Sequence, residues 1–87
     1  MIAIQNEHIK VSFAKKGAEV QSIKNVHNAT EFLWSGDANF WGKFSPVLFP
    51  IIGALKDDIY YYNEQQYRLP RHGFARDLDF EVNQLSD

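Results

Sequence analysis

The sequence predicts an all-β fold built from antiparallel sheets, and three observations support this prediction. Apolar and polar residues alternate in several short runs, which is the period of a strand with one buried face. Groups of turn-forming residues separate those runs at short intervals, as antiparallel connections require. Aromatic residues make up 15% of the chain, and such residues are enriched in strands.

Two strands are expected near the start of the chain. Residues 8–13, HIKVSF, alternate strictly, which places their three apolar side chains on one face. Gly17 interrupts this pattern, and residues 18–23 resume it as an antiparallel partner strand. Residues 25–29, NVHNA, are rich in turn formers and end the partner strand.

A short strand and one helical turn are expected next. Residues 31–34, EFLW, have strand character and stop at a Ser-Gly-Asp turn. Residues 38–41 fit a single helical turn capped by Ser35 or Asp37. Two Pro residues in the apolar stretch that follows exclude a long helix there.

A β-hairpin and a last strand complete the prediction. Residues 59–62, IYYY, and 66–69, QYRL, flank an Asn-Glu-Gln turn at residues 63–65. No Gly follows the Asn, so the sequence leaves the turn type open. Residues 78–82, LDFEV, alternate again and predict a final strand.

The chain has 87 residues and is predicted to be a single partial domain over residues 1–87. A layered β domain needs a second sheet or a closed barrel to bury its inner face. All-β domains of this kind commonly reach about 200–250 residues. We therefore expect self-association, or pairing with a missing part of the fold, because uncovered strands seek partners.

Composition excludes several classes of function. The net charge is −2 and Lys and Arg form no long run, so no nucleic-acid partner is expected. The chain has no Cys, which removes disulfides and thiolate metal sites and fits a reducing cytoplasm. The first residues lack the pattern of a signal peptide, and the apolar stretch at residues 47–52 is too short to span a bilayer. A cytoplasmic protein without a membrane partner is therefore predicted.

The densest group of chemically active side chains lies in residues 69–77, LPRHGFARD. Gly73 permits a tight turn or a close approach of ligand, and Pro70 restricts the backbone before it. Such a loop would aim the imidazole of His72 and the guanidinium of Arg76 at a polyol. A solvated surface turn is the alternative interpretation, because polar loops are commonly exposed.

Several segments together resemble the N-terminal part of the aldose 1-epimerases, and in particular their LacX-like bacterial branch. The most specific signal is FP-x-x-G at residues 49–53 followed downstream by HGFAR at residues 72–76. The EFLW and WG segments at residues 31–34 and 41–42 add to it. The resemblance extends from about residue 17 to residue 82.

The resemblance implies a β-supersandwich of the galactose mutarotase type and an isomerase that interconverts the α and β anomers of an aldose. It assigns His72 to the sugar site as a catalytic and substrate-binding residue, with no metal and no organic cofactor. Family members usually carry an Arg after the upstream Gly, and this chain has Ala54 there. Arg71 or Arg76 would then contact the sugar hydroxyls. Which aldose binds, and whether it is phosphorylated, stays open.

The implied reaction needs an acid and a base, because one proton leaves the anomeric hydroxyl and another reaches the ring oxygen. The family's second active-site His and its Glu have no counterpart in this sequence. We therefore expect an inactive fragment that carries part of the sugar site. The alternatives are a non-catalytic carbohydrate-binding or regulatory module, and a structural β domain without a ligand.

Overall fold

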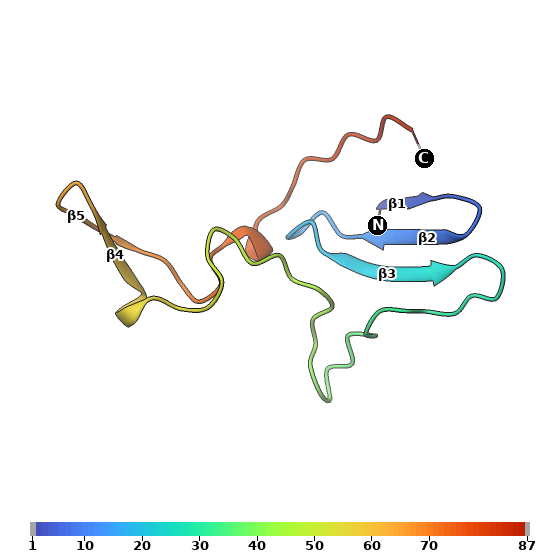
Figure 1. The fold of residues 1–87 in the computed structure, drawn as a ribbon, viewed down its shortest axis with the longest axis horizontal. Helices are drawn as coiled ribbons and strands as arrows, with labels where there is room; N and C mark the ends of the chain where they lie inside the picture. Colours follow the sequence, from blue (N-terminus) through green and yellow to red (C-terminus); the bar gives the residue numbers. More distant parts are fainter. Residues whose placement is uncertain (1, 87) are drawn as a thin grey trace.

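The computed structural model describes residues 2–86, which form antiparallel strands joined by turns and two short 3-10 helices (Figure 1). One sheet has the order β1-β2-β3 and a separate hairpin joins β4 to β5. The elements are β1 (Ile2–Gln5), β2 (Ile9–Phe13), β3 (Val20–Asn25), η1 (Lys56–Asp58), β4 (Ile59–Tyr62), β5 (Gln65–Arg68) and η2 (Ala75–Asp77). The predicted all-β, antiparallel fold is confirmed.

A β-bulge aligns the apolar residues of β3 with those of β2. The register shifts by one residue between Ser12 and Phe13, so that Phe13 lies opposite Val20. On the other side of the shift, Val11 lies opposite Ile23. An extra residue in one strand moves its neighbours to the other face. Val20 and Ile23 therefore share one face of the sheet although three positions separate them in sequence.

The sequence analysis missed β1, which pairs with β2 along its whole length. Its four residues, IAIQ, are too few for a clear alternation. Asn6 shapes the turn that follows, because its side-chain oxygen accepts hydrogen bonds from the backbone N–H groups of His8 at 2.8 Å and Ile9 at 2.9 Å. This local capping is a common role of Asn in turns.

The hairpin of β4 and β5 forms as predicted, with a shorter loop. Asn63 and Glu64 are its two loop residues, and their φ angles of 49° and 64° define a type I′ turn. Tyr60 and Tyr67 face each other across the strands with stacked rings, whose centroids lie 5.2 Å apart. The hairpin lies at the opposite end of the molecule from the three-stranded sheet (Figure 1).

The predicted helical turn at residues 38–41 is also confirmed, and Asp37 is its cap. The Asp37 carbonyl accepts hydrogen bonds from the N–H groups of Phe40 at 3.0 Å and Trp41 at 2.9 Å. Its side chain accepts a third from the N–H of Asn39 at 2.9 Å. The two 3-10 helices of the described chain have three residues each, and no helix in it is long and apolar enough to cross a bilayer.

Two predicted strands, at residues 31–34 and 78–82, are wrong. Each segment makes a single isolated bridge instead of a ladder. The carboxylate of Glu31 folds back onto β3 and accepts hydrogen bonds from the Ser22 hydroxyl and the Ile23 N–H. Residues 78–82 bond to the turn before β3 through Gly17 and Lys15, and Leu78 also donates to the Ala75 carbonyl at the end of η2. Alternation alone does not make a strand where no partner runs alongside.

The chain forms a thin layer with little core of its own. Its extents are 56 × 35 × 16 Å, and its radius of gyration is 16.7 Å. A compact chain of this length would have a radius of about 12 Å. The exposed surface is 6891 Å², and a folded protein of this mass would expose about 5300 Å². Among the apolar residues at 2–86, Leu69 and Ala75 alone are buried.

Candidate functional site

Residues 49–53 (FP-x-x-G) and residues 72–76 (HGFAR) are joined by four hydrogen bonds. Each has a backbone N–H as its donor. The N–H of Gly53 donates to Nδ1 of His72 at 2.9 Å, and the N–H of His72 donates to the Gly53 carbonyl at 2.7 Å. The Phe49 carbonyl accepts from the N–H groups of Phe74 at 2.9 Å and Ala75 at 3.2 Å. The FP-x-x-G and HGFAR segments are therefore in direct contact in the folded chain.

Gly73 makes this close docking possible. It is buried, and its φ of 71° lies in the left-handed region that favours glycine. A Cβ at this position would collide with the carbonyl group of Phe49 and with the ring of Pro50. The residue after His72 must therefore be Gly for two independent reasons, backbone conformation and space.

The bond from Gly53 also fixes the protonation pattern of His72. Because Nδ1 accepts a hydrogen bond, it carries no proton, and the neutral ring carries its proton on Nε2. The side chain is half-buried and lines a hollow in the surface. His72 can thus offer Nε2–H as a donor to an oxygen atom of a ligand in that hollow.

The hollow beside His72 has a volume of about 410 Å³. Small-molecule sites in proteins commonly measure about 300–1,000 Å³. Its lining residues are Trp41, Lys43, Pro46, Leu48, His72 and Arg76. The hollow therefore brings together donor groups of His72 and Arg76 and an apolar wall that includes Trp41.

Arg76 is held in place from two directions. Its guanidinium donates to the carbonyl oxygen of Arg71 at 3.2 Å. The turn at Gly17 packs against its backbone so closely that a Cβ on Gly17 would lie 2.7 Å from the Arg76 carbonyl oxygen. The side chain of Arg71 is exposed and does not line the hollow. Arg71 contributes to this geometry through its backbone carbonyl.

Comparison with known proteins identifies the family. The family model of aldose 1-epimerase matches residues 1–87. The chain belongs to the aldose 1-epimerase family. Its similarity to the plasmid-encoded protein LacX of Lactococcus lactis subsp. lactis amounts to 33% identity over 91 residues. That match covers 99% of this chain and 30% of LacX.

Solved structures agree with this assignment to the aldose 1-epimerase family. A galactose mutarotase related enzyme from Lactobacillus acidophilus is 47% identical, with a TM-score of 0.91 over 98% of this chain and 28% of that one. A galactose mutarotase-like protein from Lactobacillus casei ATCC 334 is 44% identical, with a TM-score of 0.93 over all of this chain and 30% of that one. The chain thus has a galactose mutarotase-like fold and spans less than a third of each relative.

Three residues of the hollow were missed as site residues by the sequence analysis. Lys43, Pro46 and Leu48 line it together with His72. Pro46 and Leu48 belong to the segment that carries the family resemblance, but nothing in the local pattern assigns them a role. Lys43 lies in neither the FP-x-x-G segment nor the HGFAR segment, and nothing in the local pattern indicates it.

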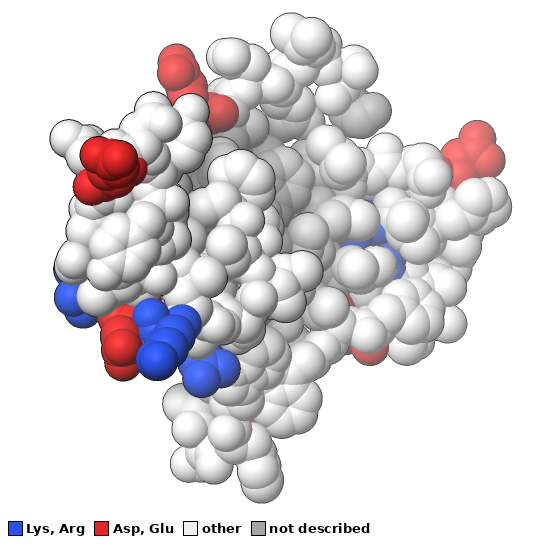
Figure 2. Space-filling model, turned by 60° about the vertical axis from the view of Figure 1, so that its left-hand side comes forward, with Lys and Arg blue, Asp and Glu red and all other residues white. Residues whose placement is uncertain are grey.

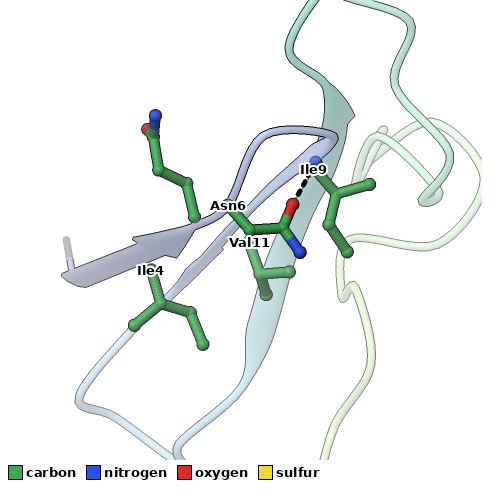
Figure 3. Close-up of a pocket in the computed structure, with 5 residues that line it drawn as sticks. Ile4, Asn6, Ile9 and Val11 are labelled. Carbon is green, nitrogen blue, oxygen red and sulfur yellow. Dashed lines mark hydrogen bonds between the residues drawn. The ribbon is translucent and has the colours of Figure 1, made fainter. Parts of the chain in front are cut away.

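A second hollow, of about 180 Å³, lies at the turn between β1 and β2 (Figure 3). Apolar side chains of Ile4, Ile9 and Val11 line much of it, and the Asn6 side chain is already bonded to the Ile9 N–H. None of its lining residues titrates. Proton-transfer chemistry therefore points to the hollow at His72, and this second one belongs to the uncovered sheet face.

Proposed function

We propose that the hollow at His72 is one wall of the sugar site of a protein that interconverts the α and β anomers of an aldose. The observation that carries this proposal is the fixed His72, with Nε2–H available beside Arg76 and Trp41. An aldose presents oxygen acceptors along its edge and an apolar C–H face. Donors from His72 and Arg76 match the first, and the Trp41 ring matches the second.

The chemistry of the reaction indicates which part this chain supplies. Anomer exchange removes a proton from the anomeric hydroxyl and delivers one to the ring oxygen, so the ring opens and recloses. Each assisted transfer contributes about 10²–10⁴-fold to the rate. His72 supplies a donor, and none of the residues that line the hollow is Asp or Glu. We therefore propose that this chain binds sugar and does not turn it over by itself.

Binding can be tested by NMR with D-galactose and D-glucose on ¹⁵N-labelled protein. Sugar is expected to shift the His72 imidazole nitrogens and the Trp41 indole N–H. His72→Asn tests the donor, because Asn tolerates a positive φ and its oxygen can still accept from Gly53. We expect about a tenfold loss of affinity, equivalent to about 1.4 kcal/mol. His27→Asn, in an exposed turn, is the matched control.

Equal affinity of His72→Asn and His27→Asn for sugar would contradict the site. Turnover is measured by polarimetry on freshly dissolved α-D-galactose, where the chain is expected to add nothing to the buffer rate. A rate that scales with protein concentration and disappears in His72→Asn would show that residues of this chain supply both proton transfers.

A non-catalytic carbohydrate-binding module is the second candidate. Two observations favour it: Ala54 stands where family members carry an Arg, and the hollow has no carboxylate lining. The encoding gene decides between the two, because a catalytic protein must also encode the second His and the Glu of the family. A cytoplasmic location remains a prediction from the absence of Cys.

A further inference from the structure

Two lysines lie directly opposite each other on the polar face of the three-stranded sheet. Lys10 of β2 and Lys24 of β3 are Cα partners in the antiparallel ladder, and strand alternation places Lys10 on the face opposite Ile9 and Val11. Side chains in this arrangement have Cβ atoms about 4.5–5.5 Å apart, and like charges there destabilise a sheet. A neutral residue at either position would remove the repulsion. Such a violation of the usual pairing rule is a mark of a functional site.

The neighbouring strands compensate only part of this charge. β1 places Gln5 opposite Lys10, so a neutral amide stands where a carboxylate would pair with the ammonium group. On the other side of Lys24, Glu31 forms an isolated bridge. Its carboxylate accepts hydrogen bonds from the Ser22 hydroxyl and from two backbone N–H groups. Two ammonium groups against one carboxylate leave this row of side chains with an excess of positive charge.

The two lysines also line a hollow of about 310 Å³. Small-molecule sites commonly measure about 300–1,000 Å³, so the space suits a small ligand. The lining residues are Gln5, Lys10, Lys24, Asn25, Val26 and Ala29. None of them is acidic, and the ammonium and amide groups all offer hydrogen-bond donors. The hollow therefore concentrates donors and positive charge without a carboxylate to satisfy them.

The turn after β3 holds Asn25 in place at this hollow. Its N–H donates to the Thr30 carbonyl at 2.9 Å, and its carbonyl accepts from the Ala29 N–H at 2.9 Å. Its side-chain oxygen accepts from the His27 N–H at 2.8 Å, so the amide NH₂ group is the end left for a ligand. Figure 1 shows this turn at the end of the sheet away from η2. The hollow at Lys10 and Lys24 is thus separate from the one at His72.

The distribution of charge over the rest of the surface favours a small anion over a polyanion. Figure 2 shows Lys and Arg in small separate groups on the face it presents, with Asp and Glu at other scattered points. A nucleic-acid backbone would require a continuous basic band. A phosphate group carries a charge of about −1.5 to −2 at neutral pH and several acceptor oxygens. Lysine binds phosphate as a point charge, so two opposed lysines suit one phosphate group.

We propose that this hollow binds a compact oxyanion, a phosphate group in particular, between the ammonium groups of Lys10 and Lys24. A bound phosphate converts the repulsion between the two lysines into two favourable contacts, and the amide groups of Gln5 and Asn25 add donors. Free phosphate and a phosphate monoester share this chemistry. Val26 would contact the organic part of a monoester. The site is independent of the proposed sugar site, so its failure would leave that proposal standing.

NMR titrations of ¹⁵N-labelled protein with inorganic phosphate, phenyl phosphate and acetate, at equal ionic strength, test the proposal. Phosphate should shift the backbone N–H signals of Lys24 and Asn25 and bind at least about tenfold more tightly than acetate. Lys10→Gln should weaken phosphate binding about tenfold, whereas Lys56→Gln, at an exposed position of η1, should leave it unchanged. Without phosphate, Lys10→Gln should have a higher Tm than the unaltered chain, because the repulsion is gone. Added phosphate should raise the Tm of the unaltered chain much more than that of Lys10→Gln.

The phenyl phosphate titration distinguishes the two sources of the phosphate group. Tighter binding than inorganic phosphate would assign the site to a monoester, and binding no tighter would assign it to free phosphate. Equal affinity for phosphate and acetate, or no binding of either, would refute the site. Equal losses in Lys10→Gln and Lys56→Gln would show that general charge attracts the anion. Phosphate-induced shifts at His72 without shifts at Lys24 would place the anion elsewhere and also refute the proposal. A lower Tm of Lys10→Gln without phosphate would refute the repulsion on which the argument depends.

Discussion

Replacing Gly73 with Ala is expected to separate the His72 loop from the segment on which it docks. A side chain at the φ of 71° costs about 1–2 kcal/mol in the left-handed region. The new Cβ would also displace the Phe49 carbonyl, which accepts hydrogen bonds from Phe74 and Ala75. Each lost bond costs about 1 kcal/mol, so the free energy of unfolding should fall by about 3–4 kcal/mol.

Gly53→Ala provides the matched control. Gly53 also has a left-handed φ, of 84°, but no atom lies within 4 Å of a Cβ built on it. The free energy of unfolding of Gly53→Ala should fall only by the cost of a side chain at a left-handed φ, about 1–2 kcal/mol. The two variants should therefore differ by about 2 kcal/mol, or about thirtyfold in the folding equilibrium constant. Urea unfolding at one fixed protein concentration measures both. Equal losses would refute the collision with Phe49.

Two further outcomes follow from Glu31 and from the uncovered sheet. The pKa of Glu31 lies below its ordinary value of 4.5, first because the Ser22 hydroxyl donates to the carboxylate and then because the Ile23 N–H does. A lowered pKa means that Glu31 stabilises the fold above its unfolded-state pKa and that this stabilisation is lost as the pH falls through the folded-state pKa. Glu31→Gln should flatten the pH dependence of the free energy of unfolding below about pH 4.5. An unchanged pH profile would count against the hydrogen bonds from Ser22 and Ile23 to the Glu31 carboxylate. Sedimentation equilibrium at micromolar concentration should detect dimers or larger species that Ile4→Lys, at an exposed apolar position, shifts toward monomer. A single monomeric species of the unaltered chain would show that its sheet needs no cover.

The sequence predicts those strands whose pattern and partner are both local. The regular alternation of residues 8–13 predicts β2, and its neighbour β3 follows after one turn. Residues 78–82 alternate as regularly, yet no ladder forms along them in the described chain. Periodicity describes one strand, whereas pairing depends on what runs beside it. The bulge opposite Phe13 is equally invisible, because it depends on the register between two strands.

The candidate site likewise contains some residues that a local pattern predicts and others that only the folded chain brings there. His72 and Arg76 belong to one short segment, and their grouping around Gly73 is visible in the sequence. Leu48 reaches the hollow because the neighbouring Phe49 docks against that segment. Lys43 reaches it next to Phe44 and Ser45, which bond to Glu19 and Val20. No local pattern encodes such a contact. The partnership of Gly53 with His72, which sets the tautomer of the imidazole, is likewise a property of the folded chain.

The hairpin of β4 and β5 lowers the conformational entropy lost when the two docking segments meet. Closing a flexible loop costs more entropy as the loop lengthens. The segment between Gly53 and His72 is folded back on itself, and the Leu69 N–H donates to the Asp58 carbonyl at 2.8 Å to extend the pairing to the hairpin base. Once the hairpin has formed, only a short flexible loop is left to close between Gly53 and His72. Its exposed tip at Asn63 is a place where a fluorescent label or an affinity tag can be inserted while the imidazole stays in position.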